Sequence, residues 1–398
     1  MDEGVVITGI GVVSPLNPDG DPERFWASVR KGENAVRRIR SFDASRYPCQ
    51  VAAEVLREEP EDESIDPALR LAQDAFRRAL GEARLALGEY DARRAGIVVG
   101  TVLGGVSSGA DYFRVTGSGR SFGGDRLKQY PLGAIASRLA RVGSLRGPVL
   151  TVSTACASGT DAVGVAARRI REGRADIMIA GGVDALSEFS FSGFCALNAL
   201  TFDAVRPFSR NRSGLALGEG AAFLVLEREQ SAMRRDVQLL GRVAGYASTS
   251  DATHLTAPNR EGSGLASAAA AACREGGVAP ARIDYVSAHG TGTLYNDAME
   301  TRALKSLLGP HYKEVPVSSI KAGLGHSFGA AGAMEALVCL FAIRDGVVPP
   351  TANFEEPDPD CDIDCVPNSE RSVAVRTALS LSAGFGGQNA ALVLGCAE

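Results

Sequence analysis

Apolar and polar positions follow one another along the chain in a succession of predicted elements that occurs twice. Residues 148–173 begin with an apolar, β-rich run, pass through a turn of small residues and end in a helix rich in Ala and Gly that closes on Arg-Glu-Gly. Residues 315–346 repeat this order and close on Arg-Asp-Gly. Because a glycine after charged residues is a common helix stop, each stretch predicts a strand, a tight turn and a helix.

The segments on either side extend the repeat. Each unit is preceded by a helical pattern and a strand, and is followed by two apolar strands at glycine turns. The paired segments are 66–87 with 262–278, 95–105 with 283–293, 175–185 with 377–387, and 218–227 with 389–395. An order of elements that occurs twice indicates a duplicated architecture. We divide the chain into halves 1–240 and 241–398, with the charged segment 227–236 near their boundary.

This duplicated pattern predicts an α/β fold. Short strands that alternate with helices favour mostly parallel sheets covered by helices. The helices predicted at 157–169 and 329–341 consist of small and apolar residues on nearly all sides, and such helices are normally buried. We therefore expect both helices to be buried between sheets.

Composition and charge exclude several classes of protein. The chain has 398 residues, of which 45% are hydrophobic and 22% charged, as in ordinary folded proteins. The net charge of −5 lacks the basic surplus of a general nucleic-acid binder. The longest apolar run, 336–343, is far shorter than the roughly 18–20 residues of a membrane span. The acidic N-terminus lacks the positive region of a signal peptide, so we expect a cytoplasmic protein that binds neither nucleic acid nor membrane.

The cysteines do not predict a metal site. Eight are present, without a secretory context that would favour disulfides. Only Cys361 and Cys365 lie close together, and their segment supplies no further Cys or His ligand.

The repeat suggests where chemistry takes place. Two of the four histidines, His289 and His326, occupy glycine turns of the second half, and Cys156 occupies the equivalent turn of the first half. Because equivalent turns of a pseudo-twofold repeat meet in space, these three side chains form a candidate site with a nucleophile and base candidates. Lys321 lies five residues before His326 in the same glycine-rich stretch.

The position of Cys156 predicts an activated nucleophile. It lies at a strand-to-helix junction, where the helix dipole favours the thiolate and lowers the pKa, and a turn of small residues exposes the sulfur. Structural alternatives stay open for each residue taken alone: a buried apolar cysteine, histidines at strand ends and a solvated lysine. The glycines in VVITGIGVVSP do not complete a dinucleotide-binding motif, which disfavours an oxidoreductase.

Six ordered motifs resemble those of the β-ketoacyl-ACP synthases, the condensing enzymes of the thiolase superfamily. The resemblance covers essentially the whole chain. Its motifs are the opening VVITGIGVVSP, TACASG around the cysteine, RPFSRNRSGLALGEGAAFLVLE, AHGTGTLYNDAMET, SSIKAGLGHSFGAAG and the closing GFGGQNA. It implies a thiolase-like duplicated fold with five layers, α-β-α-β-α, and either fatty-acid or type II polyketide or polyene synthesis.

The resemblance also implies how the reaction proceeds. Cys156 would accept an acyl group from an acyl carrier protein (ACP), with the backbone N–H groups of Cys156 and Phe385 as the oxyanion hole. His289 and His326 would then hold the carbonyl of malonyl-ACP while it loses carbon dioxide. The carbanion would attack the thioester and give a 3-oxoacyl-ACP.

Further residues carry supporting roles in this resemblance. Lys321 and Glu300 would orient and tune the histidines. Phe385 would gate an acyl pocket lined by Leu103. The chain departs from the family pattern beside this gate, with Gln388 in place of a common Thr and Ala383 in place of a common Phe, and it is shorter around 200–206. These departures put the acyl-chain length in doubt and weakly favour a specialised pathway.

The resemblance implies partners but no cofactor, because the acyl groups arrive on the phosphopantetheine of the carrier. An acidic carrier needs basic contacts; the candidates, each of which has solvated surface charge as its alternative, are Arg126, Lys128, Arg206, Arg210 and Arg212. A homodimer is expected, or a heterodimer with a chain-length-factor paralogue. Two other functions stay open: a non-condensing partner subunit of that chain-length-factor type, and a decarboxylase that never condenses.

Overall fold

Ten strands form one continuous hydrogen-bonded sheet in which each half of the chain contributes five. The computed structural model describes residues 4–56, 62, 64–85 and 90–397. The first half contributes β1 (Val5–Val13), β4 (Ala95–Gly100), β5 (Val149–Val152), β6 (Ile177–Asp184) and β8 (Gly220–Arg228). The second contributes β9 (Gly241–Ser250), β10 (Tyr285–Ser287), β11 (Val317–Ser318), β14 (Thr377–Gly384) and β15 (Gln388–Gly395).

The strand order is the same in both halves. The first half is arranged β5-β4-β6-β8-β1 and the second β11-β10-β14-β15-β9, so each uses its third, second, fourth, fifth and first strand in turn. A short antiparallel pairing of Val6 with Arg242 and Ile7 with Gly241 joins β1 to β9. The duplication that the sequence predicts is therefore present in the topology.

The sheets are mixed rather than mostly parallel, which corrects the sequence prediction. Among the described strands of the ten-stranded sheet, only the pairs β4–β5, β4–β6, β10–β11 and β10–β14 are parallel. The last strand of each half runs back against its neighbours: β8 is antiparallel to β6 and β1, and β15 to β14 and β9. In the second half the reason is local, because only the short turn Phe385–Gly387 separates β14 from β15, and a short turn makes an antiparallel pair.

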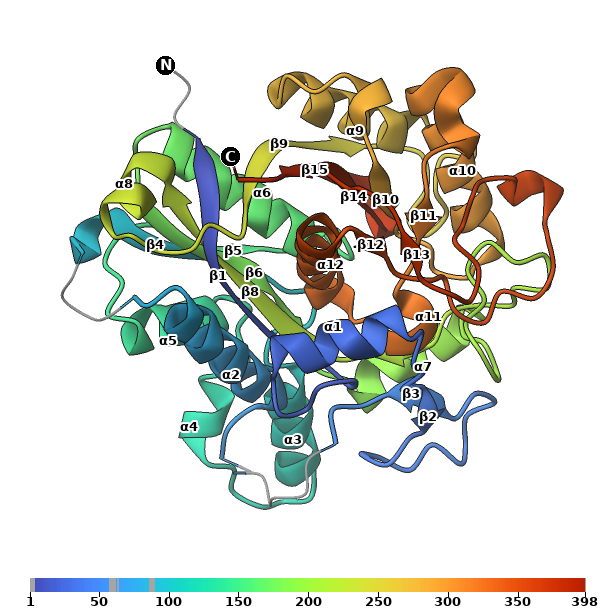
Figure 1. Cartoon of the computed structure of the whole chain (residues 1–398). Coiled ribbons are helices and arrows are strands. Elements are labelled where there is room, and N and C mark those ends of the chain that lie inside the picture. Colours follow the sequence, from blue (N-terminus) through green and yellow to red (C-terminus); the bar gives the residue numbers. More distant parts are fainter. Residues whose placement is uncertain (1–3, 57–61, 63, 86–89, 398) are drawn as a thin grey trace.

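Helices form three layers around the two half-sheets, as Figure 1 shows. The outer layer of the first half contains α2 (Pro67–Glu82) and α5 (Gly133–Val142), and that of the second contains α9 (Ser263–Glu275) and α10 (Leu294–Leu308). The middle layer contains α6 (Ser158–Arg171) and α12 (Ala331–Asp345). Separate apolar cores fill the spaces between the layers, which confirms the predicted five-layered α-β-α-β-α fold.

The two central helices approach each other through small residues. A Cβ on Gly159 would lie 2.5 Å from the Gly329 carbonyl oxygen, and one on Gly332 would lie 2.0 Å from Thr160 Oγ1. Residues 331–342 of α12 are all buried, as the sequence predicts for a helix in a middle layer. The contact brings the N-terminal ends of both helices together, beside the turns that carry Cys156 and His326.

Shorter elements complete the chain. The helices are α1 (Pro22–Arg30), α3 (Val106–Gly117), α4 (Gly124–Leu127), α7 (Glu188–Ala196), α8 (Glu229–Arg234) and α11 (Lys321–Leu324). Two small sheets contain β2 (Arg37–Arg38), β3 (Val51–Ala53) and β7 (Leu217–Gly218), and β12 (Val347–Val348) with β13 (Arg371–Ser372). In the part of the chain described, no helix has both the length and the apolar character that a membrane span requires.

Candidate active site

The nucleophile candidate lies in a strained turn between β5 and α6. Ala155, the residue before Cys156, has φ of 50°, in the left-handed region that side-chain-bearing residues rarely adopt. Such strain persists only where the surrounding structure holds it. Here Ser158 Oγ donates to the Ala155 carbonyl at 2.5 Å and accepts from the Thr154 N–H at 2.9 Å. The turn thereby directs Cys156 toward the second half of the chain.

The structure brings Cys156 together with His289 and His326. His289 lies in the turn between β10 and α10, and His326 lies just after α11. The Cys156 sulfur and one ring nitrogen of each histidine all lie within 4.8 Å of one another, and all three residues are buried. The two imidazoles meet edge to face, with ring centroids 5.3 Å apart. Three turns that are far apart in sequence therefore present their side chains to one point.

Glu300 holds the turn of His289. Its carboxylate accepts hydrogen bonds from the backbone N–H groups of His289 at 2.6 Å and Gly290 at 2.8 Å. Burial raises the pKa of Glu300 to about 8, although these two hydrogen bonds oppose the shift. Glu300 thus acts on the His289 backbone and not on its ring.

Lys321 forms a buried ion pair with Glu335 of α12. Ser382 Oγ of β14 also donates to Glu335, at 3.5 Å. Glu335 was not among the residues that the sequence singled out. A signal was available, because it is the one charged residue within the otherwise apolar buried stretch 331–342, and a buried charge needs a partner.

Burial determines the protonation of the three central groups. It raises the pKa of the Cys156 thiol to about 11, with the Lys321 charge opposing that shift. The sequence-based expectation of a lowered pKa is therefore wrong, because desolvation of the thiolate outweighs the favourable charge nearby. Burial, and then the Lys321 charge, lowers the pKa of both His289 and His326 well below its usual value, so both imidazoles are neutral at neutral pH.

These groups face a cavity of about 350 Å³ that opens to the surface. Its lining includes the buried Cys156, His289 and His326, Phe385, and the exposed Leu294 and Tyr295. Nδ1 of His289 and both ring nitrogens of His326 are buried and have no hydrogen-bond partner within the described structure. Unpartnered buried polar atoms are rare in folded proteins, so these imidazoles retain hydrogen-bonding capacity beside the cavity.

Comparison with known proteins identifies the family. The model of the beta-ketoacyl synthase N-terminal domain matches residues 2–232, and that of the C-terminal domain matches residues 240–355. The chain belongs to the beta-ketoacyl synthase family. Curated relatives include 3-oxoacyl-[acyl-carrier-protein] synthase 2 of Synechocystis sp., 37% identical over 98% of this chain and 97% of the relative. The oxytetracycline polyketide putative beta-ketoacyl synthase 1 of Streptomyces rimosus is 40% identical over 98% and 96%.

Solved beta-ketoacyl synthase structures agree with this membership. The ishigamide ketosynthase/chain length factor has a TM-score of 0.94 at 35% identity, with both chains fully covered. A ketosynthase structure described as a type II polyketide synthase acyl-carrier protein in complex with its ketosynthase has a TM-score of 0.92 at 31% identity, again over both whole chains. The resemblance found in the sequence motifs is thereby confirmed for family and fold.

The ketosynthase gate candidate Phe385 lies in a glycine turn that a second loop holds. Gly386 and Gly387 have φ of 80° and 75°, values that glycine adopts without strain. The Gly386 N–H donates to the Leu255 carbonyl at 2.7 Å, and the Asp251 N–H donates to that of Gly387 at 2.8 Å. The Phe385 N–H hydrogen-bonds the Cys156 sulfur, which opposes the rise in the pKa of that thiol. The oxyanion-hole role of this N–H stays a prediction.

Two other gate candidates lie farther from the cavity. Leu103 packs in the apolar cluster of Phe191 and Phe328, and its N–H donates to Asp184 at 2.8 Å. Gln388 begins β15 opposite Gly384 and Ser250. Neither residue lines the cavity described above, so their contact with an acyl chain stays a prediction.

The five candidate docking residues differ in their access to a partner. Arg212 does not fit a docking role, because its side chain is only 3% exposed. Its guanidinium is held by Asp358 and by the carbonyls of Ser209, Thr293 and Leu294. Lys128 pairs with Asp125 at 2.7 Å, but both side chains are exposed, and Arg210 is also exposed. Both remain accessible to an acidic surface.

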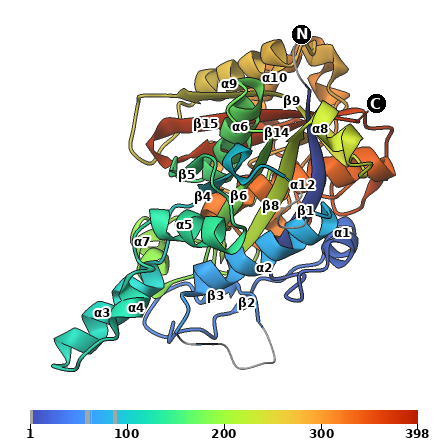
Figure 2. The same ribbon diagram turned by 90° about the vertical axis from the view of Figure 1, so that its left-hand side faces the viewer.

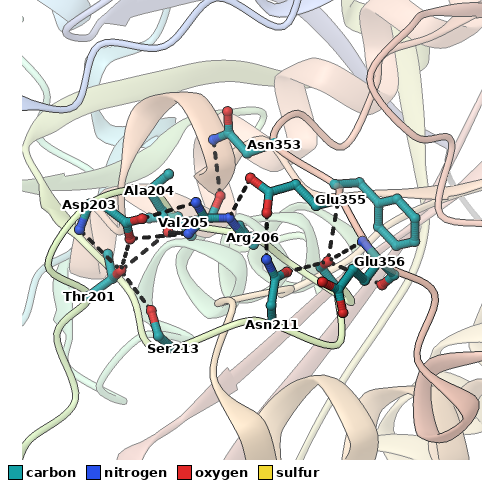
Figure 3. A network of polar contacts seen from close by, with 12 residues as sticks. Thr201, Asp203, Ala204, Val205, Arg206, Asn211, Ser213, Asn353, Glu355 and Glu356 are labelled. Carbon is teal, nitrogen blue, oxygen red and sulfur yellow. Dashed lines mark hydrogen bonds and ion pairs between the residues drawn. The ribbon is translucent and has the colours of Figure 1, made fainter.

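Arg206 and Arg126 are held more firmly by acidic neighbours. Figure 3 shows Arg206 between Asp203 and Glu355, and Glu355 in turn holds Asn211. Arg126 pairs with Asp111 at 2.5 Å. A carrier would have to compete with these acids for either guanidinium.

A thiolate and two neutral imidazoles are also a donor set that zinc accepts. The cluster of Cys156, His289 and His326 is the group of metal-ligating side chains found in the described residues. Family membership explains these residues without a metal, and the expected absence of one stays a prediction.

Proposed function

We propose that Cys156, His289 and His326 together catalyse decarboxylative condensation of an acyl group with malonyl-ACP. The single observation that carries this proposal is the convergence of one thiol and two neutral imidazoles, all buried, on one cavity. A thiol can hold an acyl group as a thioester, and neutral imidazole N–H groups suit a charge that develops only in the transition state.

The first half-reaction loads the enzyme. The Cys156 sulfur attacks the thioester carbonyl of an acyl-ACP, and the N–H groups of Cys156 and Phe385 stabilise the oxyanion. The carrier thiol leaves with the proton that the Cys156 thiol gives up. Because the pKa of this thiol is raised to about 11, the thiol is the resting form and the proton is transferred during attack.

The second half-reaction makes the carbon–carbon bond. His289 and His326 donate hydrogen bonds to the thioester oxygen of malonyl-ACP, the bond to the carboxylate breaks, and carbon dioxide leaves. The resulting enolate carbon attacks the acyl carbonyl on Cys156, and the sulfur departs and takes up one proton. Glu300 positions His289 through its backbone, while Lys321 and Glu335 keep charge close to the reacting atoms without facing water.

The partners in this proposal are an acyl carrier protein and a second ketosynthase-like subunit. The solved relatives named above include a ketosynthase bound to its carrier and a ketosynthase/chain length factor. Arg210 and Lys128 are the accessible basic residues among the docking candidates. We propose that the acyl chains are carried on phosphopantetheine and that the protein acts in the cytoplasm without a further cofactor.

Intact-protein mass spectrometry after incubation with a panel of acyl-ACPs tests the proposal. The wild type should gain the mass of one acyl group, and Cys156→Ala should gain none. His326→Ala should still be acylated but should form no 3-oxoacyl-ACP when malonyl-ACP is added. A wild type that no chain acylates would overturn the proposal and favour a non-condensing partner subunit. Acylation and decarboxylation without a condensed product would indicate a decarboxylase.

A further inference from the structure

Four aromatic rings form a continuous series from the gate to the second histidine. Phe385 stacks on Phe194 of α7 with ring centroids 5.6 Å apart. Phe194 meets Phe328 edge to face at 5.7 Å, and Phe328 stacks on His326 at 5.9 Å. We call Phe385, Phe194, Phe328 and His326 the aromatic series.

The His326 ring is oriented by packing rather than by hydrogen bonds. Its backbone is fixed, because its N–H donates to the Ala216 carbonyl at 2.7 Å and its carbonyl accepts from Gly218 at 2.9 Å. Both ring nitrogens, by contrast, lack a partner in the described structure. Phe328 lies against one side of the imidazole, and the His289 ring meets it at 84°. The position of Phe328 therefore determines the direction in which His326 can donate.

Phe328 is itself held in a strained conformation. Its φ is 51°, which is unusual for a bulky side chain and costs free energy that the surroundings must supply. The residue is 2% exposed, and its ring is enclosed by the apolar cluster that also contains Phe194 and Leu103. Strain of this kind at a functional turn indicates a position that must be set accurately.

Phe385, at the other end of the series, lies in the glycine turn between β14 and β15. It is flanked by Gly384, Gly386 and Gly387, two of them with positive φ, and its ring covers Phe194 beside Cys156. In the acyl pocket that the resemblance implies beside Leu103, a long acyl chain attached to the Cys156 sulfur would have to pass this ring. Displacement removes the stack on Phe194 and frees the next ring of the series.

We infer that Phe328 is a positioning residue that couples the filling of the acyl pocket to the orientation of His326. With the gate closed, the complete aromatic series holds His326 in its resting orientation. An acyl chain that displaces Phe385 loosens Phe194 and Phe328, and His326 then turns to hold the malonyl thioester. Malonyl-ACP is thereby decarboxylated mainly when an acyl chain is present to receive the carbanion. This inference rests on the proposed function.

Two alkylating agents separate gate displacement from modification of the cysteine. Full-length enzyme is labelled on Cys156 with iodoacetamide, whose short group leaves the gate in place, or with N-octyl iodoacetamide, whose chain must pass Phe385. Mass spectrometry verifies a single adduct. The rate of conversion of malonyl-ACP and one proton to acetyl-ACP and carbon dioxide is then measured for each form. In the wild type, the octyl-labelled form should decarboxylate malonyl-ACP about threefold to tenfold faster than the iodoacetamide-labelled form. This range corresponds to the loss of one aromatic stack.

Variants of two phenylalanines test whether the coupling between the acyl pocket and His326 passes through Phe328. In Phe328→Leu, the decarboxylation rates of the octyl-labelled and iodoacetamide-labelled forms should lie within about twofold of each other. Phe191→Leu is the matched control, because Phe191 is equally buried in the same cluster but contacts the rings of Phe42 and Tyr47 instead. It should keep the wild-type ratio even if the free energy of unfolding falls by a similar amount.

The outcomes separate this inference from the proposed function. Equal rates of the two labelled forms in the wild type, or a wild-type ratio retained in Phe328→Leu, would overturn the coupling while leaving the condensing function in place. A decrease of the ratio in Phe191→Leu as large as in Phe328→Leu would also overturn it, because the effect would then be general to the cluster. Absence of decarboxylation in every form would count against the proposed function instead.

Discussion

Cys156 combines two properties that oppose each other, a proposed reactive role and burial. The sequence correctly places a cysteine at a strand-to-helix junction, and that position alone favours the thiolate. Sequence cannot show how much water the folded chain removes, and this removal determines the protonation state. The positive charge of Lys321 is the largest effect that opposes the loss of water, and Glu335 partly neutralises it.

The pH dependence of alkylation should show this balance. Because the pKa of Cys156 is raised to about 11, the thiolate fraction below that pH rises about tenfold per pH unit. The rate of reaction with iodoacetamide should therefore keep rising beyond pH 9. Lys321→Ala should slow the reaction further, since loss of the nearby positive charge raises the pKa again. A rate that levels off near pH 8 would show that the helix position dominates.

At the scale of single elements, the contact between α6 and α12 determines how closely the two halves meet. Gly159 and Gly332 lie where a Cβ would overlap the opposite helix. The sequence indicated that both helices are buried between sheets, because their residues are small and apolar on nearly all sides, and this pattern was sufficient to predict the middle layer. It did not give the direction of the last strands in each half, because a strand pattern has the same period whether its neighbours are parallel or antiparallel.

Gly332→Ala should therefore destabilise the protein. Its Cβ would lie 2.8 Å from the Thr160 backbone nitrogen as well as 2.0 Å from its hydroxyl, and forcing extra volume into a packed core costs about 1–3 kcal/mol. Gly81→Ala is the control, since Gly81 lies in α2 with nothing within 4 Å of the added Cβ. Gly81→Ala should raise the free energy of unfolding by about 0.4–1 kcal/mol, because alanine reduces the conformational entropy of the unfolded chain. Chemical denaturation measures the free energy of unfolding of both variants. Equal changes in the two variants would contradict the close contact between α6 and α12.

The candidate site was predictable as a set of residue types but not as a geometry. His289, His326 and Cys156 stand out because they occupy corresponding turns of a repeat. Glu335 pairs with Lys321 only through the packing of α12 against α11, and Phe194 approaches Phe328 from a helix more than a hundred residues away in sequence. In sequence Arg212 cannot be told from a surface arginine. Only its buried contacts with carbonyl groups in the structure distinguish it.

For the whole molecule, one side of the first half is open to a partner. Strand β5 is the outer strand of the sheet, and its backbone edge has no neighbour among the described strands. Large apolar side chains are exposed in β5 and in nearby helices: Val149 by 39%, Phe113 by 69% and Phe189 by 68%. Figure 2 places β5, α3 and α7 along the same side of the molecule. Exposed edges and apolar groups of this kind mark association surfaces.

Val149→Glu combined with Phe113→Glu should therefore convert a dimer into a monomer. A charge in an apolar interface removes burial on both subunits and leaves an unpaired carboxylate. Sedimentation velocity would show the mass change. Met233→Glu is the control, because Met233 is 69% exposed on α8, on the opposite side in Figure 2. A monomeric wild type would contradict a homodimer and direct the search to a paralogous subunit.

The division of the site between two halves has a consequence for the newborn protein. A ribosome completes the first half, which contains Cys156, before it adds the segment that contains His289 and His326. The nucleophile thus exists for a time without the imidazoles, without the Phe385 N–H and without α12 beside it. Under the proposed function, the chain gains the ability to form carbon–carbon bonds only when its second half folds against the first, so an unfinished molecule cannot decarboxylate malonyl-ACP.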